Sequence, residues 1–152
     1  MRFILIIIIS LFFNSSVNSE LIKPNPNIEP DQVIKIQLEA LKNNDLPYED
    51  AGISQTWEFA HPENRKFTGP LSNFIKIMKS NAYVSMLKHN NHKIIFVSKN
   101  INKANYFVEL TDKTGSKFGF TWTVKKVLTN GNFKNCWMTS GVSRPLPLAK
   151  SA

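Results

Sequence analysis

Hydrophobic positions recur at two different periods along the chain, and the change between them divides it into two halves. Up to about residue 80 the apolar residues recur at spacings of three and four, which is typical of amphipathic helices. This spacing predicts three helices, which begin near Pro30, Asp45 and Pro70. Asp45 is expected to cap the second helix, and residues 62–69 are expected to form a loop before the third.

From Tyr83 onward apolar and polar residues alternate, which is the period of a β-strand with one buried face. The alternation predicts strands over residues 83–88, 93–100, 105–111, 117–128 and 133–142. Asn130-Gly131 predicts a hairpin corner between the last two strands. Helices followed by consecutive antiparallel strands indicate an α+β fold. We expect Phe118, Phe120 and Trp122 to pack against the helices.

The first nineteen residues have the pattern of a signal peptide. Arg2 is followed by an apolar run that ends at Phe13, and small or tolerated residues precede Glu20. The run is too short to span a bilayer, so no transmembrane segment is expected after processing, although an uncleaved short anchor is the alternative. We expect export to the periplasm, the thylakoid lumen or the extracellular space. The expected organisation is a signal peptide at 1–19, an extended leader at 20–30, one α+β domain at 31–144 and a tail at 145–152.

The chain is basic, with 19 Lys and Arg against 11 Asp and Glu and a formal net charge of +8. Its lysines are scattered and not gathered in a stripe, so we expect no nucleic-acid partner. Adhesion to an anionic membrane surface or to an acidic protein remains open. Cys136 is the only cysteine, so no internal disulfide can form. We expect it to be a small buried side chain, with a reactive thiol as the alternative.

Motifs for metal binding, nucleotide binding or a catalytic nucleophile do not occur in the sequence. We therefore expect no metal and no cofactor. His89 and His92 flank Asn90-Asn91, in what we expect to be a solvent-exposed turn. The pair lacks a nearby third ligand, so its spacing does not indicate a zinc site.

Three segments resemble a known protein family. They are QLEALKNND at 37–45, FAHPENR at 59–65 and FIKIMK at 74–79 followed by Tyr83. The chain resembles an uncharacterised family of bacteria, cyanobacteria and plants that is grouped with the nuclear-transport-factor-2-like, or SnoaL-like, α+β cone proteins. The resemblance covers roughly residues 30–142. It implies three helices that close a curved antiparallel sheet around a cavity, and it carries over no catalytic residue.

Several side chains are candidates for such a cavity. The expected ligand-binding residues are Trp57, His61, Arg65, Tyr83 and Trp122. His61 titrates near neutral pH and would suit a proton carrier paired with Asp50, while its alternative role is a helix cap that donates to a carbonyl. Arg65 would hold an anionic ligand group, or would pin its loop by pairing with Glu58, Glu63 or Asp50.

These observations favour an exported, noncatalytic domain that binds a small apolar or amphipathic ligand or a protein partner. A ligand-binding cavity is expected to reach about 300 Å³. The main alternative is a small acid–base enzyme of the isomerase, dehydratase or hydrolase type, with His61 as proton carrier. A homodimer formed through the sheet face is compatible with either function.

Overall fold

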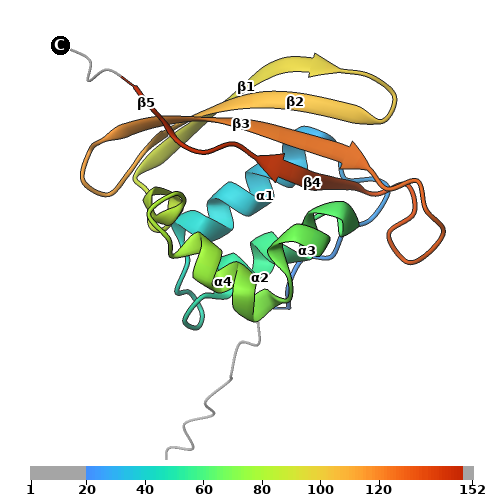
Figure 1. Cartoon of the computed structure of the whole chain (residues 1–152), viewed down its shortest axis with the longest axis horizontal. Coiled ribbons are helices and arrows are strands. Elements are labelled where there is room, and N and C mark those ends of the chain that lie inside the picture. Colours follow the sequence, from blue (N-terminus) through green and yellow to red (C-terminus); the bar gives the residue numbers. More distant parts are fainter. Residues whose placement is uncertain (1–19, 149–152) are drawn as a thin grey trace, which may run out of the picture.

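The computed structural model describes residues 20–148, in which helices precede an antiparallel sheet (Figure 1). This confirms the predicted α+β class, while the expected signal peptide at 1–19 lies outside the described residues. The helices are α1 (Pro30–Lys42), α2 (Ala51–Glu58), α3 (Pro62–Thr68), α4 (Leu71–Met78) and the short 3₁₀ helix η1 (Val84–Met86). The strands are β1 (Asn91–Lys99), β2 (Lys103–Thr111), β3 (Lys117–Lys126), β4 (Trp137–Val142) and β5 (Leu146–Pro147).

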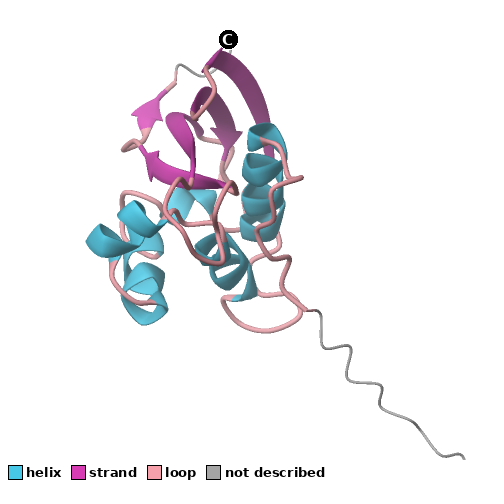
Figure 2. Ribbon diagram, turned by 90° about the vertical axis from the view of Figure 1, so that its right-hand side faces the viewer, coloured by secondary structure: helices cyan, strands magenta, loops and turns pink. Residues whose placement is uncertain are grey.

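The sheet has the order β1-β2-β3-β4, and each neighbouring pair is antiparallel. Strand β5, which lies in the expected tail, pairs with the beginning of β3. The sheet is curved, and the helices lie together beneath one of its faces (Figures 1 and 2). None of the helices in residues 20–148 is long and apolar enough to cross a membrane.

Strand β3 shows why the sheet and the helices pack as they do. Phe120, Trp122 and Val124 point to the helical layer and are at most 1% exposed, whereas Thr121 faces solvent. Phe118 is half-buried at the rim of the same core. The predicted burial of the aromatic side of this strand is therefore confirmed, and it follows from the period of two. Helix α1 meets this face with a fully buried stripe that includes Val33, Ile34, Leu38 and Leu41.

The start of α2 differs from the prediction. The helix begins at Ala51, after Asp50 in a left-handed conformation with φ 61°, and not near Asp45. The Asp45 carboxylate instead accepts a hydrogen bond from the Asp50 amide at 3.1 Å and pairs with Lys88. The hydrogen bond from Lys88 lowers the pKa of Asp45. Asp45 thus organises the connecting loop and does not cap the helix.

The expected loop at 62–69 is mostly helix α3. Pro62 occupies its first position, where the missing amide hydrogen costs nothing. His61 is the N-cap, and its Nδ1 accepts a hydrogen bond from the Glu63 amide at 3.1 Å. A single proline therefore ends one helical segment and begins the next, so the described part of the chain has four α-helices and not the three that were expected.

Two expectations about the strands are also wrong. Residues 83–88 contain the 3₁₀ helix η1 and no strand. Strands β3 and β4 are antiparallel neighbours, but the connection of residues 127–136 is longer than a two-residue hairpin at Asn130-Gly131. The reason is that Val127, Cys136 and Met138 form a small buried cluster that anchors this loop. Cys136 is 1% exposed, as expected for a small buried side chain, and burial raises the pKa of its thiol.

Candidate functional site

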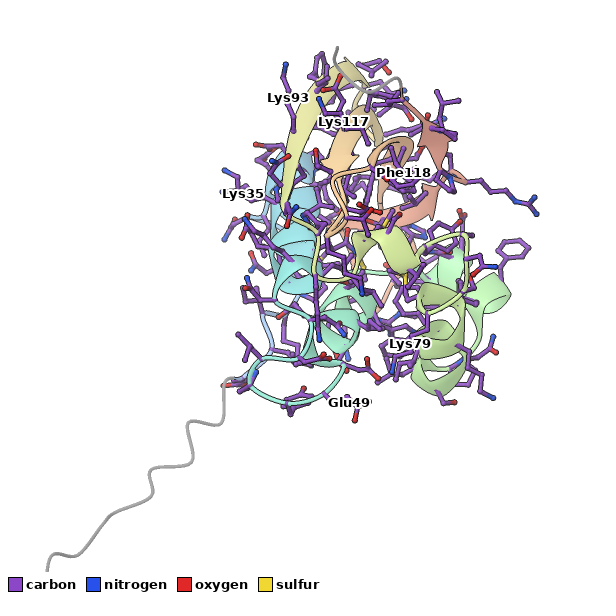
Figure 3. The ribbon with its side chains drawn as sticks, turned by 90° about the vertical axis from the view of Figure 1, so that its left-hand side faces the viewer. Lys35, Glu49, Lys79, Lys93, Lys117 and Phe118 are labelled. Atoms are coloured by element: carbon purple, nitrogen blue, oxygen red, sulfur yellow. The ribbon has the colours of Figure 1, made fainter. Side chains whose placement is uncertain are left out.

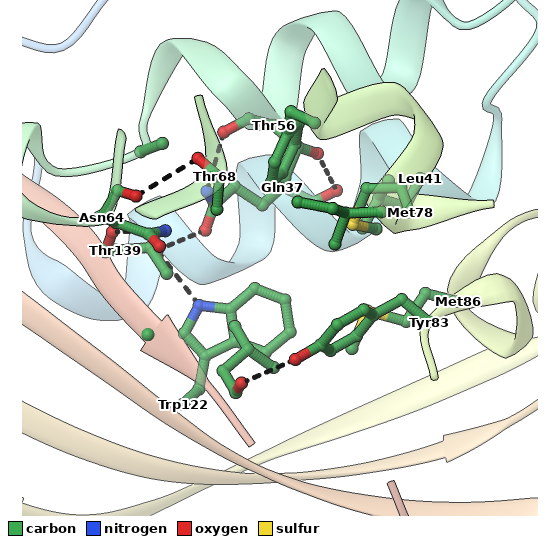
Figure 4. Close-up of a pocket in the computed structure, with 15 residues that line it drawn as sticks. Gln37, Leu41, Thr56, Asn64, Thr68, Met78, Tyr83, Met86, Trp122 and Thr139 are labelled. Carbon is green, nitrogen blue, oxygen red and sulfur yellow. Dashed lines mark hydrogen bonds between the residues drawn. The ribbon is translucent and has the colours of Figure 1, made fainter. Parts of the chain in front are cut away.

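A cavity of about 140 Å³ lies between the helices and the β3–β4 side of the sheet (Figure 4). Helices α1 to α4, η1 and both strands contribute to its wall. One half of the wall is apolar and includes Leu41, Phe74, Met78 and Met86, all of them buried. The other half is polar and includes Gln37, Thr56, Asn64, Thr68 and Thr139. The cavity therefore has one apolar end and one polar end.

The polar wall is a continuous hydrogen-bonded network (Figure 4). Thr139 Oγ1 donates to Gln37 Oε1 at 2.6 Å and accepts from Trp122 Nε1 at 3.1 Å. Gln37 Nε2 donates to the carbonyl oxygen of Thr56 at 3.0 Å. These bonds connect β3, β4, α1 and α2 in a buried environment, where each is costly to break. The network holds the walls at fixed separations and so keeps the cavity from collapsing.

Further hydrogen bonds lie at the helix α3 and η1 sides of the cavity. Tyr83, next to η1, donates from its hydroxyl to the carbonyl oxygen of Val142 at 3.1 Å. Asn64 Nδ2 is 3.4 Å from the carbonyl oxygen of Thr139, and Thr68 Oγ1 donates to the carbonyl oxygen of Asn64 at 3.2 Å. Each of these contacts joins a half-buried residue of the wall to a neighbour. They place the hydroxyl and amide groups of this side in defined positions.

The cavity wall is electrically neutral. Among the residues that line it in the described part of the chain, none is Asp, Glu, His, Lys or Arg. The hydroxyl of Tyr83, which also lines the cavity, already donates to a carbonyl. General acid–base chemistry needs a titrating group within hydrogen-bond reach of the substrate. The lining residues in the described part of the chain include no carboxylate, imidazole or amine that could serve as such a group.

The structure brings two of the five predicted ligand-binding residues to the cavity. Tyr83 and Trp122 line it, whereas Trp57, His61 and Arg65 do not. In each of these three cases the residue immediately before lines it instead: Thr56, Ala60 and Asn64. Thr56 and Trp57 lie in α2, and Asn64 and Arg65 lie in α3, where one residue corresponds to about 100° around the helix. The larger side chain of each pair therefore points away from this cavity. Sequence alone favoured the larger side chains, which pack outside the cavity wall.

Arg65 pins the segment between α2 and α3 through carbonyl groups and not through the expected carboxylates. Its guanidinium donates to the carbonyl oxygens of Trp57 at 2.9 Å, Glu58 at 3.0 Å and Ala60 at 3.0 Å. The same group lies 3.7 Å from the centre of the Trp57 ring. A cation is favourable at the C-terminal end of a helix. Arg65 is therefore a cap for α2 and does not face the cavity.

His61 and Asp50 do not form the predicted acid–base pair, because they lie at opposite ends of α2. Asp50 forms an ion pair with Lys79 at 2.7 Å, at the end of the molecule away from the sheet, where Lys79 and Glu49 are labelled in Figure 3. His61 is 6% exposed, and its Nδ1 is occupied as an acceptor at the start of α3. Burial lowers the pKa of His61. The expected capping role is thus filled by Nδ1 as an acceptor, while a hydrogen bond to the backbone of Lys126 opposes the lowering of the His61 pKa, in keeping with the expected donation to a carbonyl.

The expected solvent-exposed turn at His89 and His92 is instead a hydrogen-bonded histidine pair, in which His89 is buried and His92 is half-buried. His89 is 2% exposed, and its Nδ1 lies 2.7 Å from the carbonyl oxygen of Met86. Because a carbonyl only accepts, this nitrogen carries the hydrogen, and His89 Nε2 accepts from His92 Nδ1 at 2.7 Å. His92 Nε2 lies 3.6 Å from Glu39 Oε1. Burial lowers the pKa of both rings, and residues 20–148 contain no group of three side chains able to hold a metal.

Comparisons with known proteins found no match to the chain among family models, curated proteins or solved structures. The family resemblance therefore remains an expectation from the sequence motifs.

Proposed function

We propose that the protein is a noncatalytic binding domain whose cavity holds a small, mainly apolar ligand about the size of a benzene ring. The cavity is smaller than the expected 300 Å³ or so, because buried Phe74, Met78, Met86 and Trp122 occupy much of the space between the layers. At about 140 Å³ it is close to the size of an apolar cavity of about 150 Å³ known to bind benzene. The ligand is therefore a single ring or a short branched chain.

The observation that carries this proposal is a neutral wall whose polar groups are already paired. In the described chain, the buried side-chain polar atoms without a partner are Trp57 Nε1 and Ser85 Oγ, and neither residue lines the cavity. A charged ligand would lose its hydration here without gaining a partner. An apolar ligand gains dispersion contacts with the surrounding side chains.

The cellular setting belongs to the same proposal. The pattern of residues 1–19 supports export, so the ligand would be met in the periplasm, the thylakoid lumen or the extracellular space. The cone-like arrangement of helices over a curved sheet agrees with the resemblance to nuclear-transport-factor-2-like proteins. The acid–base alternative has less support, because His61 lies outside the cavity and Asp50 lies at the other end of α2.

Thermal unfolding of the chain with and without toluene tests the proposal. A ligand at ten times its Kd stabilises the native state by about 1.4 kcal/mol, which raises Tm by about 3 to 6 °C. Ala60→Leu places a larger side chain against the cavity and should abolish the shift. Ala40→Leu is the matched control, because Ala40 lies on α1 outside the cavity wall, and it should retain the shift.

Gly141→Val supplies a second way to fill the cavity, since an added Cβ at this lining residue meets no atom within 4 Å. Benzoate has the same ring with a charge and should give no shift. The proposal is wrong if toluene leaves Tm unchanged, or if benzoate stabilises the chain as much as toluene does.

A further inference from the structure

A broad groove of about 800 Å³ lies on the surface at one end of the sheet. We call it the basic groove, and its wall is formed by the β1–β2 turn, the end of β3 with the following loop, and the start of α3. These segments meet at the same end of the molecule in Figure 1. Four lysines line it, against one carboxylate, Glu63: Lys66, Lys103, Lys125 and Lys126. The scattered lysines of the sequence are therefore partly gathered by the fold.

The lysines of the basic groove differ in their partners. Lys125 pairs with Glu63 at 3.1 Å, and Lys126 lies 5.0 Å from the centre of the Trp137 ring. Lys66 and Lys103 are exposed and form no ion pair within residues 20–148. The groove thus carries positive charge that the chain itself leaves uncompensated.

Two exposed aliphatic side chains stand beside these lysines. Ile101 is 79% exposed at the tip of the β1–β2 turn, and Leu128 is 60% exposed in the loop after β3. Both residues line the basic groove. A single exposed aliphatic residue is ordinary on a protein surface. Here two of them, on two loops that line the same groove, are accompanied by four lysines.

Hydrogen bonds order the turn around Ile101 and the base of the Leu128 loop, where the Val127 amide donates to the carbonyl oxygen of Cys136 at 2.9 Å. Asn100 Oδ1 accepts from the amides of Asn102 at 3.0 Å and Lys103 at 2.8 Å, which fixes the turn around Ile101. The Lys126 amide donates to the carbonyl oxygen of Asn102 at 2.9 Å and joins this turn to the end of β3. Ordering these loops on binding therefore has a small entropic cost.

We propose that the basic groove and its two tips form a docking surface for an anionic lipid bilayer. Ile101 and Leu128 enter the boundary between headgroups and acyl chains, while Lys66 and Lys103 contact lipid phosphates. Binding of this kind combines buried apolar area with attraction to anionic lipid. Charge complementarity alone also fits an acidic protein, but separate protruding aliphatic tips fit a deformable apolar layer better than a folded surface. The proposal is independent of the cavity ligand.

Sedimentation with vesicles of phosphatidylcholine, alone or with 30% phosphatidylglycerol, at low and high salt tests this proposal. We expect binding to the anionic vesicles only, weakened by salt. Lysines close to an anionic surface add to its attraction, so reversing Lys66 and Lys103 to Glu should weaken binding about ten-fold or more. Reversal of Lys76 and Lys113, which lie outside the basic groove, is the charge-matched control and should weaken it less.

The aliphatic tips have a matched control in the same residue type. Leu128→Asp should weaken vesicle binding several-fold, whereas Leu46→Asp, at a 71% exposed leucine in the loop before α2, should have a smaller effect. All variants are made in the full chain, so any contribution from residues 1–19 is common to them. Hydrogen exchange of the same samples should show protection of amides 100–103 and 127–131 when vesicles are added.

Any one of four results with vesicles would overturn the proposal. They are equal binding to neutral vesicles, unchanged binding of the Lys66/Lys103 variant, unchanged binding of Leu128→Asp, and exchange protection elsewhere with none at the two tips. Soluble polyglutamate that binds as tightly as the anionic vesicles would also overturn it, in favour of an acidic protein partner.

Discussion

The cavity and the basic groove are both lined in part by residues of the sheet, but they differ in volume, in charge and in exposure to solvent. The cavity is about 140 Å³, neutral and bordered by a buried hydrogen-bonded network, whereas the basic groove is about 800 Å³, open and lined by four lysines. Strand β3 serves both, because it gives Trp122 to the cavity and Lys125 and Lys126 to the groove. The difference shows that one strand can supply a neutral site along its buried face and a charged site at its end.

The largest expected effect comes from removing the side chain that anchors the cavity. Trp122→Ala should lower the free energy of unfolding by about 3–5 kcal/mol, because it enlarges a buried cavity and removes the partner of Thr139. Ile101→Ala at the basic groove should change it by no more than about 0.5 kcal/mol. Urea unfolding of both variants measures the contrast. Equal losses would mean that the two regions do not differ in their structural importance.

A smaller effect is expected from the polar wall. Gln37→Leu and Thr139→Val each remove one side of the 2.6 Å hydrogen bond and should each cost about 1–3 kcal/mol. The double variant should cost less than the two single losses added together, with a coupling of about 0.5 kcal/mol or more. A double-mutant cycle by urea unfolding gives this number. Strict additivity would show that the two side chains do not act as one network.

The smallest effect concerns the histidine pair behind the cavity wall. Burial lowers the pKa of His89 and His92 below their ordinary value of 6.5, against the opposing influence of the Met86 carbonyl on His89 and Glu39 on His92. As pH falls from about 7 to 5 the unfolded chain therefore binds more protons than the native chain, and the free energy of unfolding decreases. Above about pH 7.5 these groups add no further slope.

Urea unfolding at pH 5 and pH 7 measures this decrease. His92→Gln removes one titrating ring and should reduce the difference between the two pH values. His61 keeps part of the slope in this variant, because burial lowers its pKa as well. A larger pH difference in His92→Gln than in the original chain would contradict the assigned direction.

Patterns of residues predicted the fold class and the buried face of β3, because both follow from periodicity. The start of α2 and the existence of α3 were missed for a local reason: Pro62 both ends and begins a helix, and Asp50 precedes α2 in a left-handed conformation. The face of each short helix is set by tertiary packing, so Thr56, Ala60 and Asn64 could not be separated from the larger residues that follow them. No local pattern marks the burial of His89, which depends on contacts across the fold.

The basic groove could not be predicted from the sequence either. Lys66 and Lys103 are far apart in the sequence, and their approach depends on the β1–β2 turn meeting the start of α3. Scattered charge in a sequence therefore does not exclude a charged surface in the fold.

The most direct test of the central claim is a titration of the ¹⁵N-labelled chain with toluene, followed by two-dimensional NMR. The account predicts saturable shifts of the amides around the cavity, such as Thr56, Ala60, Thr139 and Gly141, with amides near Ile101 and Leu128 unchanged. Shifts that fail to saturate, or that gather at the two exposed tips and leave the cavity amides unmoved, would contradict a ligand-binding cavity.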